Sequence, residues 1–224
     1  DCSPGPARVA KAFDAGTIAP LAGAMPVNRE DITGCSNIVA LAGAEQINAA
    51  LQTGAEIIIA GRSTDTAVIA ALPLARGCHP GGAWHGAKIG ECGALATNNP
   101  ATGAILIEFD TEGFTVHPTG EGVRATPLTV SAHMLYENAD PFILHEPGGH
   151  LDVTAATYTA VEDDSSVRVT GSVWHPSERY TVKLEGARLA GYQTISLVLV
   201  RDRRYVEAID QWISQLREAF VQRE

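Results

Sequence analysis

The segment from His85 to Cys92 contains four side chains that can exchange protons or bind anions. In His85-x-x-Lys88-x-x-Glu91-Cys92, a helix would place the first, second and fourth of these residues on one face, with the carboxylate beside it. The pattern predicts His85, Glu91 and Cys92 as catalytic residues. Either His85 or Glu91 would be the base, and Cys92 an acid or a nucleophile. Lys88 is predicted to bind the substrate. The alternative is a solvated polar helix with one buried, inert cysteine.

A second candidate group, Gly61-Arg62-Ser63-Thr64-Asp65, lies where a strand is expected to pass into a helix. Ligands of open α/β sheets bind at the carboxyl ends of strands, where backbone amides can also hold an anion. We therefore predict that Arg62, Ser63 and Asp65 bind the substrate, with Arg62 as a bidentate partner for a carboxylate or phosphate. A capping turn with a surface arginine explains the same residues. The spacing of the nucleotide-binding glycine motifs is missing.

Two further polar positions lie at predicted turns. His145 opens the glycine-containing turn that ends at His150, where imidazoles and closely approaching backbone could meet a ligand. Lys183 lies in a strand-like run of alternating charges. Both His145 and Lys183 are predicted to bind the substrate. A simple hairpin turn and an exposed ion pair are the alternatives.

His133 and Glu137 form an i, i+4 pair in a predicted helix. Such a pair can ligate a divalent metal, or act as a base with its orienting carboxylate, although structural pairs of this kind are common. A divalent metal is therefore a possible cofactor, and the cofactor is otherwise unknown. Neither the Cys/His spacing of zinc sites nor the Gly-x-Ser-x-Gly nucleophile motif is present.

The order of the apolar runs predicts the elements that position these side chains. Strands are expected at Ile38–Leu41 and Ile57–Ala60, each followed by a helix, at Ala44–Gln52 and from Thr64. A β-branched run that leads directly into a helix is typical of a buried parallel strand. After Pro147, short β-rich segments separated by turns indicate an antiparallel sheet, and a final helix is expected at Arg204–Val221.

The sequence therefore predicts an α/β fold with a mainly parallel α/β layer, then an antiparallel sheet region with a C-terminal helix. The expected divisions are a connecting segment over residues 1–36, an α/β region over 37–145 that carries the candidate residues, and the antiparallel region with its helix over 146–224. We expect these parts to pack as one body, without a flexible linker.

Composition excludes several classes of protein. The chain has 224 residues, 45% of them hydrophobic, and a formal net charge of −10 that is spread evenly. An acidic surface argues against nucleic-acid binding and against docking on anionic membranes. No apolar run approaches the length of a membrane-spanning helix, so a cytoplasmic location is expected. The four cysteines lie far apart, which favours reduced thiols.

Two blocks of this chain resemble the acyclic terpene utilisation (AtuA-like) family. They are Gly54-Ala55-Glu56-Ile57-Ile58-Ile59-Ala60-Gly61-Arg62-Ser63-Thr64-Asp65 and His85-Gly86-Ala87-Lys88-Ile89-Gly90-Glu91-Cys92-Gly93-Ala94. Similar stretches around residues 131–138 and 180–187 extend the resemblance over about residues 34–201. Glu56 stands where the family usually has Asp. The chain starts without Met and lacks the family's glycine-rich N-terminal portion, so a missing N-terminal portion or a partner chain is expected.

The resemblance implies breakdown of acyclic terpenes or related branched acids, much of it as coenzyme A thioesters. Together with the candidate residues, it predicts an enzyme of small-acid or acyl-CoA catabolism. We expect a hydratase, isomerase or lyase that transfers a proton beside the carbonyl of a small carboxylic acid or acyl-thioester. The alternatives are a non-catalytic subunit that binds an acyl ligand or assembles with a partner, such as a homo-oligomer, and a metal-dependent hydrolase.

Overall fold

The computed structural model describes residues 3–21, 25–101, 103–161 and 165–221. The chain divides into two compact units, Asp1–Leu189 and Ala190–Glu224. Cys2 lies outside the described residues. The described cysteines are all free thiols, in agreement with the expectation for them; they are Cys35, Cys78 and Cys92.

A small apolar cluster holds the N-terminal part of the first unit. It joins helix α1 (Pro6–Asp14), helix α2 (Arg29–Thr33) and strand β1 (Asn37–Ala40). Strand β1 pairs antiparallel with β9 (Leu184–Ala187) in a two-stranded sheet, which ties residues far apart in the sequence to each other. The buried members of the cluster are Val9, Ala10, Ile32 and Ile38.

Three helices follow, α3 (Ala44–Leu51), α4 (Asp65–Ala75) and α5 (Pro80–Gly90). Helix α4 begins where the sequence predicts, because the Thr64 side chain accepts a hydrogen bond of 3.2 Å from the Ala67 amide and so satisfies one of the free donors of the first turn. A capping threonine thus fixes the direction in which α4 starts.

Two antiparallel sheets complete the first unit. Their strands are β2 (Ile105–Phe109), β3 (Gly113–Pro118), β4 (Ile143–Glu146), β5 (Gly149–Asp152), β6 (Thr157–Ala160), β7 (Val167–Thr170) and β8 (Val173–Pro176). One sheet has the strand order β2-β3-β7-β6 and the other the order β4-β5-β8. The alternation of buried and partly buried side chains in β5 and β7 is typical of strands that cover a core with one face.

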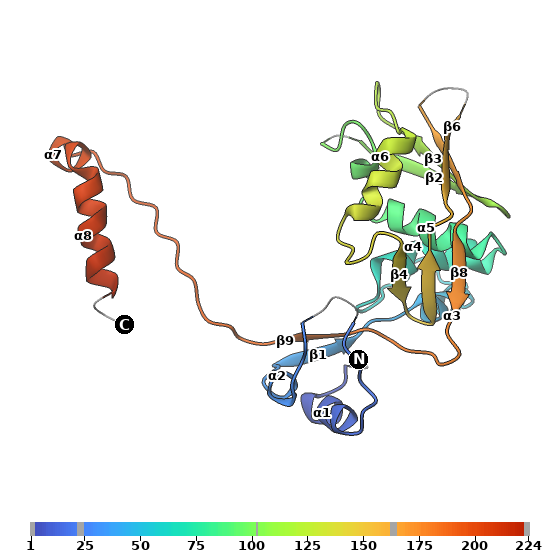
Figure 1. Ribbon diagram of the computed structural model, residues 1–224, viewed down its shortest axis with the longest axis horizontal. Coiled ribbons are helices and arrows are strands. Elements are labelled where there is room, and N and C mark those ends of the chain that lie inside the picture. Colours follow the sequence, from blue (N-terminus) through green and yellow to red (C-terminus); the bar gives the residue numbers. More distant parts are fainter. Residues whose placement is uncertain (1–2, 22–24, 102, 162–164, 222–224) are drawn as a thin grey trace. The chain divides into compact units, whose positions relative to one another are not determined.

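Helix α5 is the centre of this unit and packs against α4 and against both sheets (Figure 1). Its Trp84 is buried and stacks on Trp174 of β8, with ring centroids 4.7 Å apart. Small residues elsewhere on α5 let strands approach the helix backbone closely. Gly82, Gly86 and Gly90 lie against Gly113, Phe109 and Ile107 in this way.

Gly81 of α5 gives a direct test of this packing. A Cβ atom at Gly81 would overlap the backbone carbonyl of Ser172, which cannot move without displacing β8. We expect Gly81→Ala to lower the free energy of unfolding by about 1–3 kcal/mol, despite the better helix propensity of alanine. Denaturant unfolding measures the change. Gly61→Ala, where no atom lies within 4 Å of the new Cβ, is the control, and an equal loss in both variants would contradict the packing argument.

The mixed α/β class and the C-terminal helix are confirmed, but the strand expected at Ile57–Ala60 is wrong. Residues 57–60 form no strand, and Ile57 and Ile59 are 81% and 94% exposed. Among the described residues, parallel pairing consists of a single bridge between Ala42 and Ser63. A segment with high β propensity forms a strand only where a neighbouring strand supplies hydrogen-bond partners for its backbone.

The second unit consists of extended chain and two helices, α7 (Arg203–Glu207) and α8 (Ile209–Val221). The Tyr205 and Trp212 rings make an edge contact between the two helices, with centroids 5.8 Å apart. The strand expected at 194–201 is wrong, because this stretch is extended without a pairing partner. No helix in the part of the chain that the structure describes is both long and apolar enough to cross a membrane.

Candidate functional site

The last turn of α5 carries a buried ion pair. The Lys88 ammonium donates a hydrogen bond to Oε1 of Glu91, the residue that caps the helix. Only 7% of the Lys88 side chain and 11% of the Glu91 side chain are exposed. Two charges this deeply buried are costly unless each neutralises the other. The two side chains thus form an i, i+3 ion pair, and the roles expected for them, Glu91 in catalysis and Lys88 in substrate binding, remain predictions.

The hydroxyl of Thr66, in the first turn of α4, bridges Glu91 to a second carboxylate. Thr66 Oγ1 lies 3.0 Å from Oε1 of Glu146, at the end of β4, and 3.4 Å from Oε2 of Glu91. A hydroxyl has one proton to donate, so it cannot satisfy two ionised carboxylates fully. The arrangement favours a state in which one of the two carboxyls is protonated.

Glu146 is the carboxyl that the surroundings favour for this proton. Burial raises its pKa above the usual range, and the nearby Glu91 charge adds to the shift. Lys183, whose Nζ lies 3.9 Å from Oε1, and the hydroxyls of Thr64 and Thr66 oppose the shift without reversing it. Oε2 of Glu146 is buried and has no hydrogen-bond partner among the described residues. An unpartnered carboxyl oxygen with a raised pKa is typical of a general acid or base.

We call Thr66, Lys88, Glu91, Glu146 and Lys183 the Glu146 cluster. Its members come from α4, α5, β4 and the residue before β9, so four separate parts of the chain meet there. Two cations and two carboxylates balance each other formally. When all four groups are charged, the net charge of the cluster is zero, so the gain or loss of one proton leaves a net charge of only one.

An aromatic pair adjoins this cluster on the side of Lys88. His133 lies in the 3-10 helix η2 (His133–Leu135), and its ring stacks on that of Tyr136 at 5.6 Å between centroids. The Lys88 Nζ lies 6.0 Å from the centre of the Tyr136 ring. Interaction with Cys92, and secondarily with Glu137, raises the pKa of Tyr136 to about 12. Cys92 is thus placed beside a tyrosine hydroxyl, at the edge of the same region.

Burial lowers the pKa of His133, and the positive charge of Lys88 lowers it further. The backbone of Lys88 raises this pKa but does not reverse the shift. Neither ring nitrogen of His133 makes a hydrogen bond within the described part of the chain. The imidazole is therefore neutral at physiological pH and has both a donor and an acceptor to offer.

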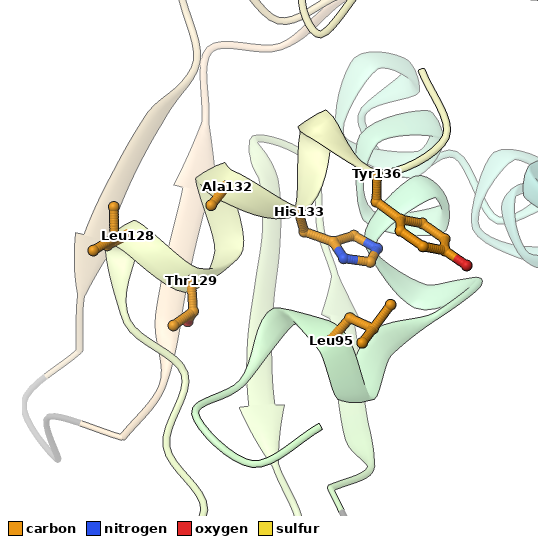
Figure 2. Close-up of a pocket in the computed structure, with 6 residues that line it drawn as sticks. All are labelled: Leu95, Leu128, Thr129, Ala132, His133 and Tyr136. Atoms are coloured by element: carbon orange, nitrogen blue, oxygen red, sulfur yellow. The ribbon is translucent and has the colours of Figure 1, made fainter. Parts of the chain in front are cut away.

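A cavity of about 360 Å³ opens against this aromatic pair. Figure 2 shows its lining: Leu128, Thr129 and Ala132 from helix α6 (Pro127–Ala132), the two rings, and Leu95 from the 3-10 helix η1 (Gly93–Ala96). The lining residues carry no formal charge. A volume of this size lies in the range of pockets that hold small organic ligands.

His85 contacts a different set of residues. It is completely buried, with Nδ1 2.7 Å from the Ser172 hydroxyl and Nε2 3.2 Å from the Tyr158 hydroxyl. Burial lowers the pKa of His85 to about 3, and burial also raises that of Tyr158 to about 12. Its ring packs edge-on against Phe114. Both nitrogens are occupied, so these contacts favour a structural role, and the catalytic role remains a prediction.

Arg62 makes a bidentate contact with Glu185 of β9, with Nε–Oε2 and Nη2–Oε1 distances of 2.9 and 3.0 Å. It also lies 3.6 Å from Asp65. Ser63 is buried beside the bridge to Ala42, and Asp65 is exposed in the first turn of α4. No described contact joins these three residues to the Glu146 cluster. Their binding of a substrate remains a prediction.

Replacing Arg62 distinguishes an anion anchor from a surface ion pair. Because Arg62 is about half exposed, we expect Arg62→Ala to lower the free energy of unfolding by at most about 1 kcal/mol. If Arg62 also held a substrate carboxylate, the same variant would bind a carboxylate probe more than about tenfold more weakly, since a charge-assisted contact is lost. Calorimetric titration of the folded variant separates these two outcomes.

His145 belongs to a row of imidazoles on the β4-β5-β8 sheet. It lies opposite His150, which lies opposite His175, with ring centroids 5.7 and 4.8 Å apart. Partial burial lowers the pKa of His150, and the neighbouring His175 and His145 lower it further. Because successive side chains of a strand point to opposite faces, His145 and Glu146 do not share a face.

The metal pair predicted at His133 and Glu137 is not formed as one helix face. Helix α6 ends at Ala132, η2 ends at Leu135, and Glu137 has a positive φ of 55°. The helix expected to carry both residues is therefore wrong beyond Leu135, where the chain turns. No group of three or more His, Cys, Asp or Glu in the described ranges could hold a metal ion.

Sequence analysis missed the residues that complete the site. Glu146 was seen only as part of a turn, and Thr66 and Tyr136 carried no signal of their own. The single available hint was that Glu146 ends a strand immediately before Pro147-Gly148, a position where a polar side chain can face inward.

Comparison with known proteins agrees with the resemblance. A family model described as acyclic terpene utilisation family protein AtuA matches residues 23–224. No curated protein and no solved structure matches the chain significantly. The chain belongs to the acyclic terpene utilisation family AtuA.

Proposed function

We propose that this member of the acyclic terpene utilisation family is an enzyme that moves a proton beside the carbonyl group of a branched acid or acyl-thioester, as hydratases, isomerases and lyases do. The observation that supports the proposal is the Thr66 hydroxyl between two buried carboxyls, Glu146 and Glu91. A proton that the two carboxyls can share, and a pKa of Glu146 that burial raises above its ordinary value, are features expected of a general acid or base.

In this proposal Glu146, in its ionised form, takes a proton at Oε2 from the carbon beside the carbonyl. The C–H bond breaks, and its electron pair moves toward the carbonyl oxygen, which becomes negative. Lys183, about 70% buried and 3.9 Å from Glu146, is the cation best placed to stabilise that oxygen. The protonated Glu146 then returns the proton to the substrate at the same or at a neighbouring carbon.

Glu91 and Lys88 have a different role in this scheme. Burial is the main cause of the raised pKa of Glu146, and the negative charge of Glu91, which Lys88 holds beside it, adds to the rise. The Thr66 hydroxyl opposes the rise in the pKa of Glu146, but it holds the two carboxyls on either side of it, at 3.0 Å from Glu146 and 3.4 Å from Glu91. The three residues are positioning residues, because in this proposal Glu146 is the group that touches the reacting carbon.

Exchange of substrate protons with D₂O tests the proposal without knowledge of the final product. A panel of branched and unsaturated acyl-thioesters and their free acids is incubated with the full chain in D₂O, with and without added divalent metal. We expect deuterium to enter at the carbon beside the carbonyl, as seen by NMR. Thr66→Val, which removes the bridge and keeps the shape, should slow this exchange about tenfold or more.

Thr159→Val is the matched control, because Thr159 is exposed on β6 and outside the cluster. It should leave the exchange rate unchanged. Absence of exchange over the whole panel would overturn the proposed chemistry. Equal exchange in wild type and Thr66→Val would overturn the role of the bridged carboxyls.

A second candidate is a non-catalytic subunit that assembles with further protein. Its supporting observation is the exposure of Ile57 and Ile59, side chains that monomeric proteins usually bury in a strand. Light scattering on the purified chain tests self-assembly. A larger species that dissociates in Ile59→Ser would support this candidate, and a monomer at every concentration would count against assembly of the chain with itself.

A further inference from the structure

Helix α8, at the C-terminal end of the chain (Figure 1), carries an apolar face that nothing in the described part of its own unit covers. Ile209, Ile213, Leu216 and Phe220 are spaced by four, three and four residues, so they lie on one side of the helix. No residue of α7 or α8 is buried, and Phe220 is 71% exposed. We call these four residues the α8 seam. Their spacing is that of the a and d positions of a coiled coil.

Two opposite charges follow one edge of the α8 seam. Asp210 and Arg217 occupy the e positions of the repeat, each directly after an apolar residue of the seam. Neither makes an ion pair within the part of the chain that the structure describes. The arginines of α7, in contrast, pair with neighbouring carboxylates. A partner that fits this face therefore has to bring both an apolar stripe and two charges in the opposite order.

A second α8 helix that runs in the opposite direction brings such a stripe. With Ile213 opposite the partner's Leu216, Ile209 lies opposite the partner's Phe220, so one register fills both layers of the seam. The two helices are then related by a twofold axis, and every contact forms twice.

The same register also matches the edges of the seam. It places Asp210 beside the partner's Arg217, and the twofold axis repeats this pair. On the other edge, the large Trp212 meets the partner's small Ala219. In a parallel pair the e positions would face g positions instead, so Asp210 and Arg217 would stay apart.

The charge of this region disfavours a membrane surface as the partner. Residues 202–221 contain three arginines and four carboxylates. Helices that lie on anionic membranes combine their apolar face with a cationic one, which is missing here. A second copy of this chain satisfies both the seam and its charges.

We propose that two copies of this chain associate through an antiparallel pair of α8 helices, held together by the α8 seam and by two symmetric Asp210–Arg217 ion pairs. The inference is independent of the proposed function, because the residues of the Glu146 cluster belong to the first unit.

Sedimentation equilibrium of the full chain at a series of concentrations measures this association, and we expect a monomer–dimer equilibrium. Leu216→Asp places a carboxylate in the seam of both copies and should raise the dissociation constant at least about hundredfold. Ser214→Asp introduces the same side chain on the outer face of α8 and should change the constant less than about twofold. A wild-type chain that stays monomeric, or a dimer that persists in Leu216→Asp, would overturn α8 as the interface.

A charge exchange tests the antiparallel register. Arg217→Asp sets two carboxylates beside each other at both ends of the pair, so the dissociation constant should rise at least about tenfold. The double variant Asp210→Arg, Arg217→Asp restores opposite charges and should return the constant to within about threefold of wild type. Failure of this rescue would overturn the register. Binding of the monomeric chain to anionic phospholipid vesicles, lost in Leu216→Asp, would assign the α8 seam to a membrane and overturn the proposal.

Discussion

Replacing Glu146 by Gln should slow the proposed proton exchange about 10²- to 10⁴-fold, the loss typical for removal of a general acid or base. The amide has nearly the same shape and can still accept a hydrogen bond from Thr66, so the surroundings of the cluster should persist. What it cannot do is take up or release a proton at the position of Oε2. Rates of deuterium entry into a branched acyl-thioester, measured by NMR, give the change.

Glu146→Gln should slow the exchange without lowering the free energy of unfolding. A slower rate in this variant therefore reports lost chemistry and not a lost fold. The pKa of Glu146 is higher in the folded chain than the ordinary value of 4.5, so the folded state binds more protons in the interval between the two values. The free energy of unfolding therefore falls as the pH rises through that interval. Glu146→Gln removes this fall, and its stability should equal or exceed that of wild type above the interval.

Glu185→Gln is the matched control, since Glu185 is a half-exposed carboxylate that pairs with Arg62. It should leave the exchange rate unchanged. If Glu146→Gln exchanged as fast as wild type, Glu146 would not be the proton carrier. If it were less stable than wild type above the pH interval, the buried Glu146 carboxyl would not carry the raised pKa that the mechanism uses.

Local patterns predicted the parts of the site that lie within one element. The Lys88–Glu91 pair follows from helical spacing, and the start of α4 follows from the capping threonine at position 64. Both depend on residues at most four positions apart. The pairing of Arg62 with Glu185 could not be predicted in this way, because it depends on the antiparallel pairing of β9 with β1, which lies far away in the sequence.

The contact between Thr66 and Glu146 could not be predicted from local sequence patterns, because it joins distant parts of the chain. Thr66 and Glu146 are separated by 80 positions, and they meet because the β4-β5 hairpin packs near the start of α4. His85 illustrates the opposite error. Its spacing from Lys88 placed both on a catalytic face, but the β3-β7-β6 strands cover His85 completely and leave it with Ser172 and Tyr158. The spacing of residues in a helix predicts which side chains share a face of that helix. Whether that face can meet a ligand depends on whether a sheet covers it.

Replacing Lys88 by Met should have the largest effect on stability of any single change in the cluster. Methionine keeps much of the apolar stem of lysine but leaves the Glu91 carboxylate buried without its counter-ion. Removal of one partner of a buried ion pair destabilises proteins by about 3–5 kcal/mol. Denaturant unfolding near neutral pH measures the loss. Lys11→Met, a change at an exposed position of α1, should alter stability by no more than about 0.5 kcal/mol.

A second substitution decides whether the loss comes from the orphaned charge. In the double variant Lys88→Met, Glu91→Gln, no charge is left unpaired, so most of the lost stability should return. The amide that replaces the Glu91 carboxylate in that variant can still meet the Thr66 hydroxyl, which keeps the bridge toward Glu146 polar. Equal instability of the single and double variants would mean that the Lys88 stem stabilises the fold by packing. The ion pair would then have no part in keeping a negative charge beside Glu146, and the high pKa of Glu146 would have to come from burial alone.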